Sequence, residues 1–207
     1  MPNYIIQMSG APGSGKSTLS QKLRHIIGGV IINHDLLKSF FLDNDIPFEQ
    51  SARLTYLFQW ILAEDLIKQG HTHIIIDSTC NHKETLDQGT ALAQKYSYSY
   101  RYIECRVDDI DLLEKRLYNR VSMRSQRSSV NQPPIDAASD ASYFEDYHTL
   151  FQRWINNPCR PASDAIIVDS TGSLEDCLDY VLKRITTSSS GQPRQAPISR
   201  SHATDDL

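Results

Sequence analysis

The sequence predicts an α/β fold in which a five-stranded parallel sheet is covered by helices on both faces. Short, largely apolar runs recur along the 207-residue chain. Segments with helical apolar spacing separate these runs. A glycine-rich loop joins the first run to the first helical segment, which is typical of a sheet with a ligand site beyond the carboxyl ends of its strands.

The five apolar runs are the predicted strands. Successive residues of a strand face opposite sides, so a run without polar alternation must be buried on both sides. Helices on the two faces of a parallel sheet provide that burial. The runs span residues 4–8, 30–32, 73–77, 100–107 and 165–169.

The segments between the runs have helical periodicity. The longest has a spacing of i, i+3, i+4, i+7 and i+8, which is typical of an amphipathic helix that faces a core. Its apolar residues are Leu54, Leu57, Phe58, Ile61, Leu62 and Leu66. Further helices are expected after the glycine-rich loop, over residues 82–96, from Asp108, around Phe144 to Trp154, and from Ser173.

Two segments depart from this pattern. Residues 122–139 are polar and contain Pro133-Pro134, and we expect a small lid over about residues 122–141, between the fourth and fifth strands. From Thr186 onward almost no apolar residue occurs, which predicts a disordered tail over residues 187–207. The predicted folded domain therefore spans residues 1–186.

Composition excludes several classes of protein. The net charge of −4 argues against a broad nucleic-acid-binding surface, so nucleic acid is a less favoured partner. No apolar stretch approaches the roughly 18 residues that span a bilayer, and the N-terminus runs straight into the first strand without a signal peptide. Four cysteines without C-x-x-C spacing indicate neither a disulfide nor a zinc site. We therefore expect a cytoplasmic protein.

The glycine-rich loop is a complete G-x-x-x-x-G-K-[ST] pattern, the Walker A motif or P-loop. Its glycines allow successive backbone N–H groups to point at one anion. The lysine brings a positive charge to the β- and γ-phosphates, and the following serine offers its hydroxyl to Mg²⁺. The motif therefore predicts ATP or another triphosphate as ligand, held by Gly10, Ala11, Pro12, Gly13, Ser14, Gly15, Lys16, Ser17 and Thr18.

Polar residues follow the second and third predicted strands, where parallel strands bring their ligands together. Asp77 ends the third strand, where an acid organises Mg²⁺, although an aspartate there is also common in turns. Ser78 and Thr79 are candidate substrate contacts or turn residues. Asp35 is a candidate general base for an acceptor hydroxyl or, alternatively, a helix cap, and Lys38 on the same helix face is a candidate contact for an anionic part of the substrate.

Arginines recur at helical spacing before the predicted lid. Arg120 and Arg124 are candidate catalytic residues that neutralise charge on the transferring phosphoryl group, and Arg127 is a candidate nucleotide contact. Arg116 belongs to the same stripe, but structural pairing is the favoured interpretation for it. A solvated basic face is the alternative for the whole stripe.

These motifs resemble the P-loop kinases of the polynucleotide-kinase and zeta-toxin-like group, also known as the AAA-33 group. The matching residues are the loop over 10–18, Asp35 with Lys38, the D-S-T-x-N segment over 77–81, and Arg120 with Arg124. Together they cover most of residues 4–185. The resemblance implies transfer of the ATP γ-phosphate to a hydroxyl, with Asp35 as base and the lid arginines on the phosphates.

The acceptor is left open at this point. Polynucleotide kinases of the group usually carry arginine where Lys38 stands, so lysine favours a small molecule or a nucleoside. A polynucleotide 5′-hydroxyl kinase and an NTPase or ATP-binding regulatory module without an acceptor are the alternatives. Aromatic residues that either stack on an acceptor ring or belong to the core are Phe40, Phe41, Phe48, Tyr56 and Trp60.

Overall fold

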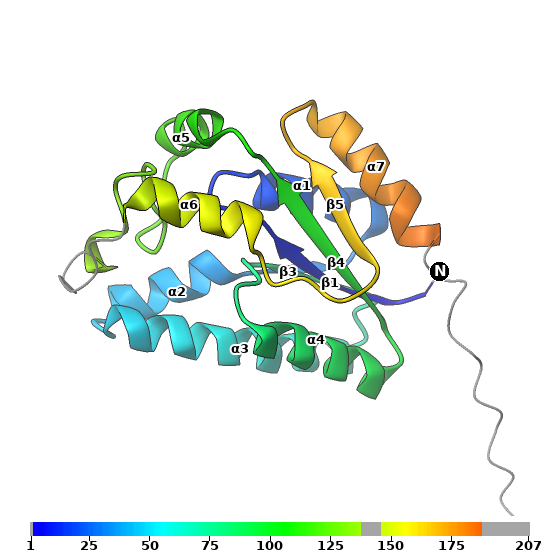
Figure 1. Ribbon diagram of the computed structural model, residues 1–207. Helices are drawn as coiled ribbons and strands as arrows, with labels where there is room; N and C mark the ends of the chain where they lie inside the picture. The colour runs from blue at the N-terminus through cyan, green and yellow to red at the C-terminus, as the bar shows by residue number, and fades with distance from the viewer. Residues whose placement is uncertain (1, 138–145, 188–207) are drawn as a thin grey trace, which may run out of the picture.

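The computed structural model describes residues 2–137 and 146–187 (Figure 1). Five parallel strands form one sheet in the order β2-β3-β1-β4-β5. Ile5 of β1 pairs with Ile74 of β3 on one side and with Tyr100 of β4 on the other. The strands are β1 (Tyr4–Ser9), β2 (Val30–Asn33), β3 (His73–Asp77), β4 (Ser99–Arg106) and β5 (Ala165–Asp169).

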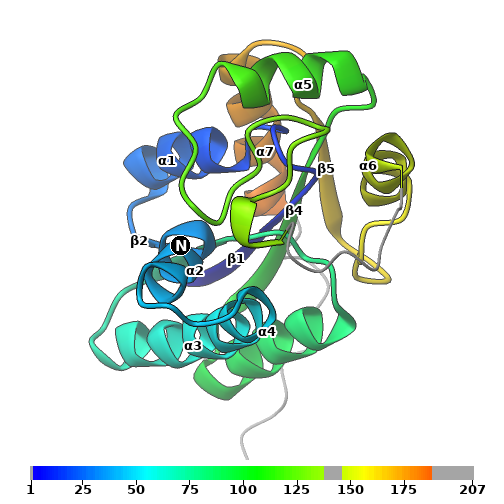
Figure 2. The same ribbon diagram turned by 90° about the vertical axis from the view of Figure 1, so that its left-hand side faces the viewer.

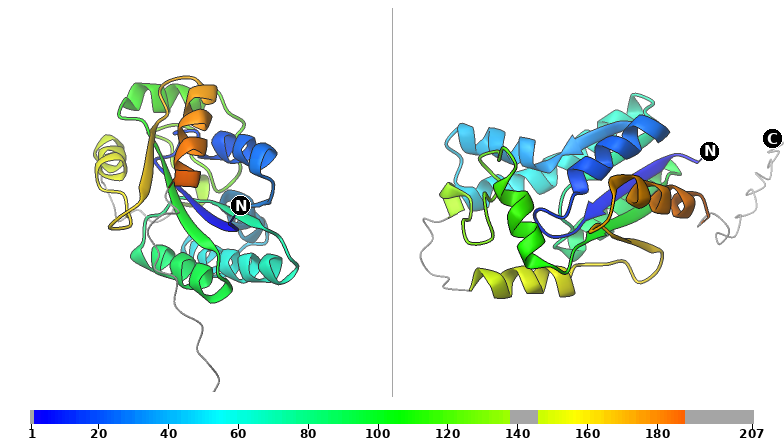
Figure 3. Two further views of the ribbon diagram at one scale, coloured as in Figure 1. Left: turned by 90° about the vertical axis from the view of Figure 1, so that its right-hand side faces the viewer. Right: turned by 90° about the horizontal axis from the view of Figure 1, so that it is seen from above.

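Helices connect the strands and cover both faces of the sheet (Figure 3). On one face, α1 and α7 pack over Ile6 and Met8 of β1, and on the other, α3 and α4 pack over Ile5. The described helices are α1 (Lys16–Ile27), α2 (His34–Asp43), α3 (Phe48–Lys68), α4 (Lys83–Tyr96), α5 (Ile110–Tyr118), α6 (Tyr147–Asn156) and α7 (Leu174–Thr187), with a short 3₁₀ helix, η1 (Ile135–Ala137).

The predicted five-stranded parallel sheet is confirmed, and the observed strands begin and end within one residue of the predicted runs. Both layers of helices are present. Residues 122–137, which we call the lid segment, form turns and η1 between α5 and α6. The remaining lid residues, 138–141, and the predicted tail from residue 188 lie outside the described residues. Within the described residues, no helix is long and apolar enough to cross a membrane.

The prediction for the apolar stripe of α3 is wrong at three positions. Leu57, Phe58 and Ile61 are 46%, 38% and 63% exposed. The inward face of α3 carries the apolar residues Trp60, Ala63 and Ile67 and, beside them, three polar side chains that are fully buried and hydrogen-bonded. They are Ser51, Thr55 and Gln59.

Candidate active site

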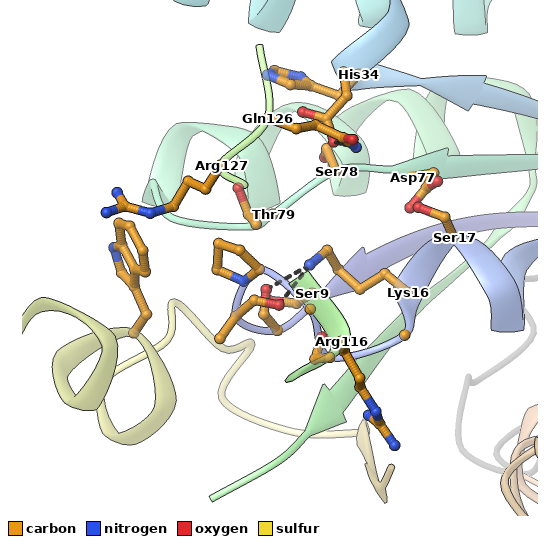
Figure 4. Close-up of a pocket in the computed structure, with 18 of the residues that line it drawn as sticks. Ser9, Lys16, Ser17, His34, Asp77, Ser78, Thr79, Arg116, Gln126 and Arg127 are labelled. Carbon is orange, nitrogen blue, oxygen red and sulfur yellow. Dashed lines mark hydrogen bonds between the residues drawn. The ribbon is translucent and has the colours of Figure 1, made fainter. Parts of the chain in front are cut away.

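The predicted site segments meet at the carboxyl ends of the strands, around one cavity of about 1010 Å³. The P-loop follows β1, Asp35 lies in the first turn of α2 after β2, and Asp77 ends β3. The lid segment contributes the opposite wall with Gln126 and Arg127 (Figure 4). The topology of the sheet therefore brings together residues that lie more than a hundred positions apart in the chain.

The P-loop has the geometry that its glycines predict. Gly10 has a φ of 125°, and a Cβ at this position would lie 2.2 Å from the carbonyl oxygen of Cys105 in β4. Gly15 has a φ of 95° and forms the left-handed N-cap of α1. A side chain at Gly10 would push β1 and β4 apart, so the loop conformation depends on glycine there.

Lys16 is the first residue of α1, and its ammonium lies across the loop. The Nζ atom donates hydrogen bonds of 2.8 Å and 3.0 Å to the carbonyl oxygens of Gly10 and Ala11 (Figure 4). Burial lowers the pKa of Lys16, although the nearby carboxylates of Asp77 and Asp35 act in the opposite direction. The loop thus positions a desolvated cation at the cavity, where an anionic ligand would interact with it strongly.

Ser17 and Asp77 form the second part of the donor side. The Ser17 hydroxyl is hydrogen-bonded to the Asp77 carboxylate, and burial raises the pKa of Asp77 against that bond and the charge of Lys16. A hydroxyl and a carboxylate are the hard oxygen donors that Mg²⁺ prefers, so these two residues fit a magnesium ion. No cluster of three or more His, Cys, Asp or Glu side chains suited to a metal occurs in residues 2–137 and 146–187.

The segment after β3 is anchored to the sheet and to α3. The hydroxyl of Ser78 accepts a 3.0 Å hydrogen bond from Nε2 of Gln7, and the Thr79 carbonyl accepts one of 3.4 Å from the Tyr56 hydroxyl. Gln7, which is fully buried in the central strand β1, is a site residue that was not predicted from the sequence. A single polar residue inside an otherwise apolar strand could have indicated that Gln7 has a role at the site.

Asp35 does not cap α2. The N-cap of this helix is Asn33, whose side chain accepts a 3.1 Å hydrogen bond from the backbone N–H of Leu36. The Asp35 carboxylate lies at the cavity and accepts a 2.7 Å hydrogen bond from Nε2 of Gln126. The interpretation of Asp35 as a helix cap is therefore wrong, because Asn33 is the N-cap.

Two hydroxyls dock the lid segment on α2 beside this carboxylate. The hydroxyl of Ser125 donates to the Asp35 carbonyl at 2.9 Å, and the hydroxyl of Ser39 lies 3.0 Å from that of Ser125. The backbone N–H of Ser125 also donates to the Ser39 hydroxyl at 3.1 Å. Both serines are buried. The position of the lid segment is thus coupled directly to the helix that carries Asp35.

Lys38 lies one turn after Asp35 and also lines the cavity. Its Nζ atom is 3.5 Å from the centre of the Phe48 ring, which is a cation–π contact. Among the described residues, no carboxylate lies within ion-pairing distance of it. Burial lowers the pKa of Lys38 to about 8, against the opposite effects of Asp35 and Glu49.

Aromatic side chains complete this wall of the cavity. The ring of His34 lies 4.5 Å from that of Tyr56, and Tyr56 lies 5.5 Å from His82. The Nδ1 of His34 is hydrogen-bonded to Oε1 of Gln59 at 3.1 Å, and His34 also lines the cavity. Phe48 and Tyr56 belong to the cavity wall, whereas Trp60 belongs to the core.

The lid arginines take three different positions. Arg120 is half-buried, lines the cavity and donates to the carbonyl of Arg127 at 2.8 Å. Arg124 makes a bidentate pair with Asp136, at 2.8 Å and 2.9 Å, and its Nη1 lies 3.4 Å from Asp43. Arg124 is therefore directed away from the cavity and joins the lid segment to the end of α2.

Arg127 is buried against aromatic rings. Its guanidinium carbon lies 4.7 Å, 5.4 Å and 5.7 Å from the ring centres of Tyr147, Phe151 and Trp154, the last of which also lines the cavity. One Nη donates to the Val130 carbonyl, whereas Nε has no hydrogen-bond partner among the described residues. Burial lowers the pKa of Arg127. Helical spacing predicted the helix that carries these three aromatic residues, but not their contact with Arg127.

Arg116, the fourth arginine of the stripe, lies on the far side of the P-loop. It donates to the carbonyl of Ser170 at 2.8 Å, as expected for a structural pair, and it also lines the cavity. Leu174 and Cys177 of α7 extend the cavity on this side. The cavity therefore continues past the P-loop, away from Asp35, into a region lined by both polar and apolar residues.

Comparison with known proteins finds one family match and several similar folds. The profile of the AAA domain family matches residues 5–142. No curated protein sequence gives a significant match. Solved structures with a similar fold include a proposed kinase from Chloroflexus aurantiacus, at 16% sequence identity and a TM-score of 0.64, with 89% of this chain and 96% of that chain covered.

Two further solved structures are similar over the same share of the chain. A gluconokinase from Sinorhizobium meliloti is 16% identical, with a TM-score of 0.57 and 89% and 91% of the two chains covered. The APS kinase CysC from Mycobacterium tuberculosis, solved with AMPPNP and APS, is 13% identical, with a TM-score of 0.55 and 89% and 98% covered. At such low identity these likenesses confirm the predicted P-loop fold and show the fold alone.

Proposed function

This chain belongs to the AAA domain family, and from that premise we propose that it is an ATP-dependent phosphotransferase with a hydroxyl acceptor. The observation that carries the proposal is that the Lys16 loop and the Asp35 carboxylate line the same cavity. A nucleotide-binding module without transfer chemistry needs the loop but has no use for a second, oriented carboxylate opposite it.

On the donor side, the loop would hold the β- and γ-phosphates of ATP. Backbone N–H groups around Gly13 to Ser17 and the N-terminal end of α1 favour the negative charge, and the Lys16 ammonium would exchange its carbonyl partners for phosphate oxygens. A magnesium ion held by Ser17, with Asp77 close by, would supply further neutralisation of the phosphate charge.

On the acceptor side, Asp35 would take the proton of the acceptor hydroxyl. The acceptor oxygen then forms a bond to the γ-phosphorus, the bond from that phosphorus to the β–γ bridging oxygen breaks, and ADP leaves with the electron pair. Gln126 would hold the carboxylate in place through the hydrogen bond to Oδ2, and Oδ1, which accepts only a long hydrogen bond of 3.4 Å from the Ser125 hydroxyl, would take the acceptor proton. Positioned proton transfer of this kind contributes about 10²- to 10⁴-fold in rate.

The lid arginines would stabilise the transferring group to different degrees. Arg120 and Arg127 already line the cavity, and one such cation contributes about 10³- to 10⁵-fold in related enzymes. Arg124 would reach the phosphates only after its bidentate pair with Asp136 has opened. We therefore assign the catalytic role first to Arg120 and give Arg124 a part only in a rearranged lid.

A small-molecule or nucleoside acceptor suits the acceptor wall best. Phe48, Tyr56 and His82 offer ring surfaces, and Lys38 offers a single cation, where a polynucleotide would require several phosphate contacts. Ser78 and Thr79 lie at the same wall as further polar contacts. The similar structures named as gluconokinase and APS kinase support this choice.

The test is transfer of radiolabelled γ-phosphate from ATP, with Mg²⁺, to a panel of nucleosides, sugars, sugar acids and 5′-hydroxyl oligonucleotides. We expect a labelled small-molecule product with the full chain. The Asp35→Asn variant should lose about 10²-fold or more of this activity and keep its affinity for ATP. Asp45→Asn, an exposed change just beyond the same helix, is the matched control and should retain activity. Label that appears only in inorganic phosphate, whatever the acceptor, would contradict the proposal.

A further inference from the structure

His34 is the first residue of α2, directly before Asp35, and two residues of α3 hold its side chain. Its Nδ1 lies 3.1 Å from Oε1 of Gln59, and the centre of its ring lies 4.5 Å from that of Tyr56. The hydroxyl of Tyr56 in turn donates to the Thr79 carbonyl. The imidazole of His34 is therefore fixed in place, and only 8% of the residue is exposed.

The contact with Gln59 decides which ring nitrogen of His34 carries the proton. The Oε1 atom of an amide only accepts hydrogen bonds, so Nδ1 donates, and in a neutral imidazole Nε2 is then unprotonated. Burial lowers the pKa of His34, against the effects of Gln59 and Asp35, so the ring is neutral at pH 7. Nε2 is thus a hydrogen-bond acceptor.

No described protein group uses this acceptor. Within residues 2–137 and 146–187, Nε2 of His34 has no hydrogen-bond partner. The residue lines the cavity on the side of Gln126, away from Arg116 (Figure 4). An unpaired acceptor in so buried a position costs free energy, so in the filled site its partner is expected to be a donor on the ligand.

We propose that Nε2 of His34 accepts a hydrogen bond from a second hydroxyl of the phosphoryl acceptor, one that is not itself phosphorylated. This inference rests on the proposed function and names its substrate class: a small polyhydroxylated compound, either a sugar or a nucleoside through its sugar. The carboxylate of Asp35 and the unprotonated Nε2 of His34 come from consecutive residues, and both need a donor. A compound with one hydroxyl would satisfy Asp35 alone, whereas a polyol satisfies both.

The rest of the acceptor wall suits such a compound. Thr79 and Asn81 line the cavity with a hydroxyl and an amide, which are hydrogen-bonded to each other at 3.2 Å. Phe48 adds an aromatic ring, an apolar surface against which the C–H groups of a sugar ring can pack. A few placed polar groups beside an apolar surface are typical of a site that recognises a small molecule.

The first experiment reads the tautomer of His34 directly. Long-range proton–nitrogen correlation spectra of the full, isotope-labelled chain are recorded at about pH 7.5, above the ordinary pKa of histidine. We expect a proton on Nδ1 and an unprotonated Nε2 for His34, whereas the exposed His25 should show a mixture of tautomers. Excess D-ribose, D-glucose or adenosine, added with ADP and Mg²⁺, should shift the Nε2 resonance of His34 and leave that of His25 unchanged.

The second experiment compares acceptors that differ by one hydroxyl: D-glucose with its 2-deoxy and 3-deoxy analogues, and adenosine with its 2′-deoxy and 3′-deoxy analogues. With the wild-type chain, removal of the hydroxyl that faces His34 should lower kcat/KM by about 10- to 100-fold, because Nε2 is left unpaired. His34→Phe keeps a ring but has no acceptor atom. This variant should lose a similar factor with the parent compound and no longer distinguish it from the analogue.

Two further variants make this comparison specific. His34→Gln places an amide oxygen at a similar reach and should restore part of the discrimination. His25→Phe, an exposed change of the same kind on α1, is the matched control and should discriminate as the wild-type chain does. Far-UV circular dichroism and the affinity for ATP show that each variant is folded.

A proton on Nε2 of His34 in the free protein would overturn the inference, as would an Nε2 resonance that no sugar or nucleoside shifts. A folded His34→Phe variant that still discriminates would also overturn it. If that variant loses transfer to parent and analogue equally, His34 acts as the base or as a structural residue, and the inference is again wrong. Label found only in inorganic phosphate would contradict the proposed function instead, and the tautomer and the Nε2 shift would still decide whether His34 contacts a polyol.

Discussion

The donor side and the acceptor side of the cavity are built in different ways. The donor side consists of the nine consecutive residues of the P-loop and Asp77 at the end of β3, and its chemistry comes from backbone geometry, one lysine, one hydroxyl and one carboxylate. The acceptor side takes side chains from α2, α3, the segment after β3 and the lid segment. A local motif can specify the first, whereas only the tertiary fold can specify the second.

Lys16 and Lys38, two of the lysines that line the cavity, show the same contrast. Burial lowers the pKa of both, but Lys16 is held by two carbonyl oxygens and lies near Asp77 and Asp35. Lys38 rests on the ring of Phe48, and its pKa falls to about 8. The ammonium of Lys16 is thus fixed by two hydrogen bonds near two carboxylates. The ammonium of Lys38 has only a cation–π contact, so an anionic substrate can raise its pKa.

We expect the largest effect on activity from a substitution on the donor side. Replacement of Lys16 by Met removes the cation that the loop positions, and we expect phosphoryl transfer to fall by about 10³-fold or more. Thermal stabilisation of the protein by ATP should also disappear, because the phosphates lose their main side-chain contact. Lys22→Met, on the exposed side of the same helix, is the matched control. Retained transfer in Lys16→Met would show that the donor side does not act through this lysine.

The sequence predicted the donor side almost completely, because the motif specifies both the backbone conformation and the ligand. The strands were equally predictable, since burial on both faces leaves a mostly apolar run, even though β1 and β4 contain buried polar residues. The α3 stripe was not: periodicity shows that Leu57, Phe58 and Ile61 share a face but does not show which way that face turns. His34 and Gln126 also escaped prediction, because each depends on a partner distant in the chain.

A smaller effect should arise at the junction of the acceptor side and the lid. Gln126→Leu removes the donor to the Asp35 carboxylate, and a hydrogen bond to a charged group contributes about 1.5–3 kcal/mol, so we expect kcat to fall by about 10- to 100-fold. The KM for ATP should not change, because no donor residue is altered. Gln132→Leu, in the exposed part of the lid segment, should leave both constants unchanged. A rise in the KM for ATP without a fall in kcat would place Gln126 on the donor side.

The smallest effect concerns pH and the acceptor. Because burial lowers the pKa of Lys38 to about 8, its ammonium is charged below this pH and becomes neutral as the pH rises through it. An acceptor with a carboxylate or phosphate near Lys38 should therefore bind best below about pH 8, and its KM should rise a few-fold between about pH 7 and pH 9. A neutral acceptor should show no such change. Lys38→Arg keeps the charge over this range and should abolish the pH dependence for the anionic acceptor. A KM that rises equally for both kinds of acceptor would assign the titration to another group and remove Lys38 from the acceptor side.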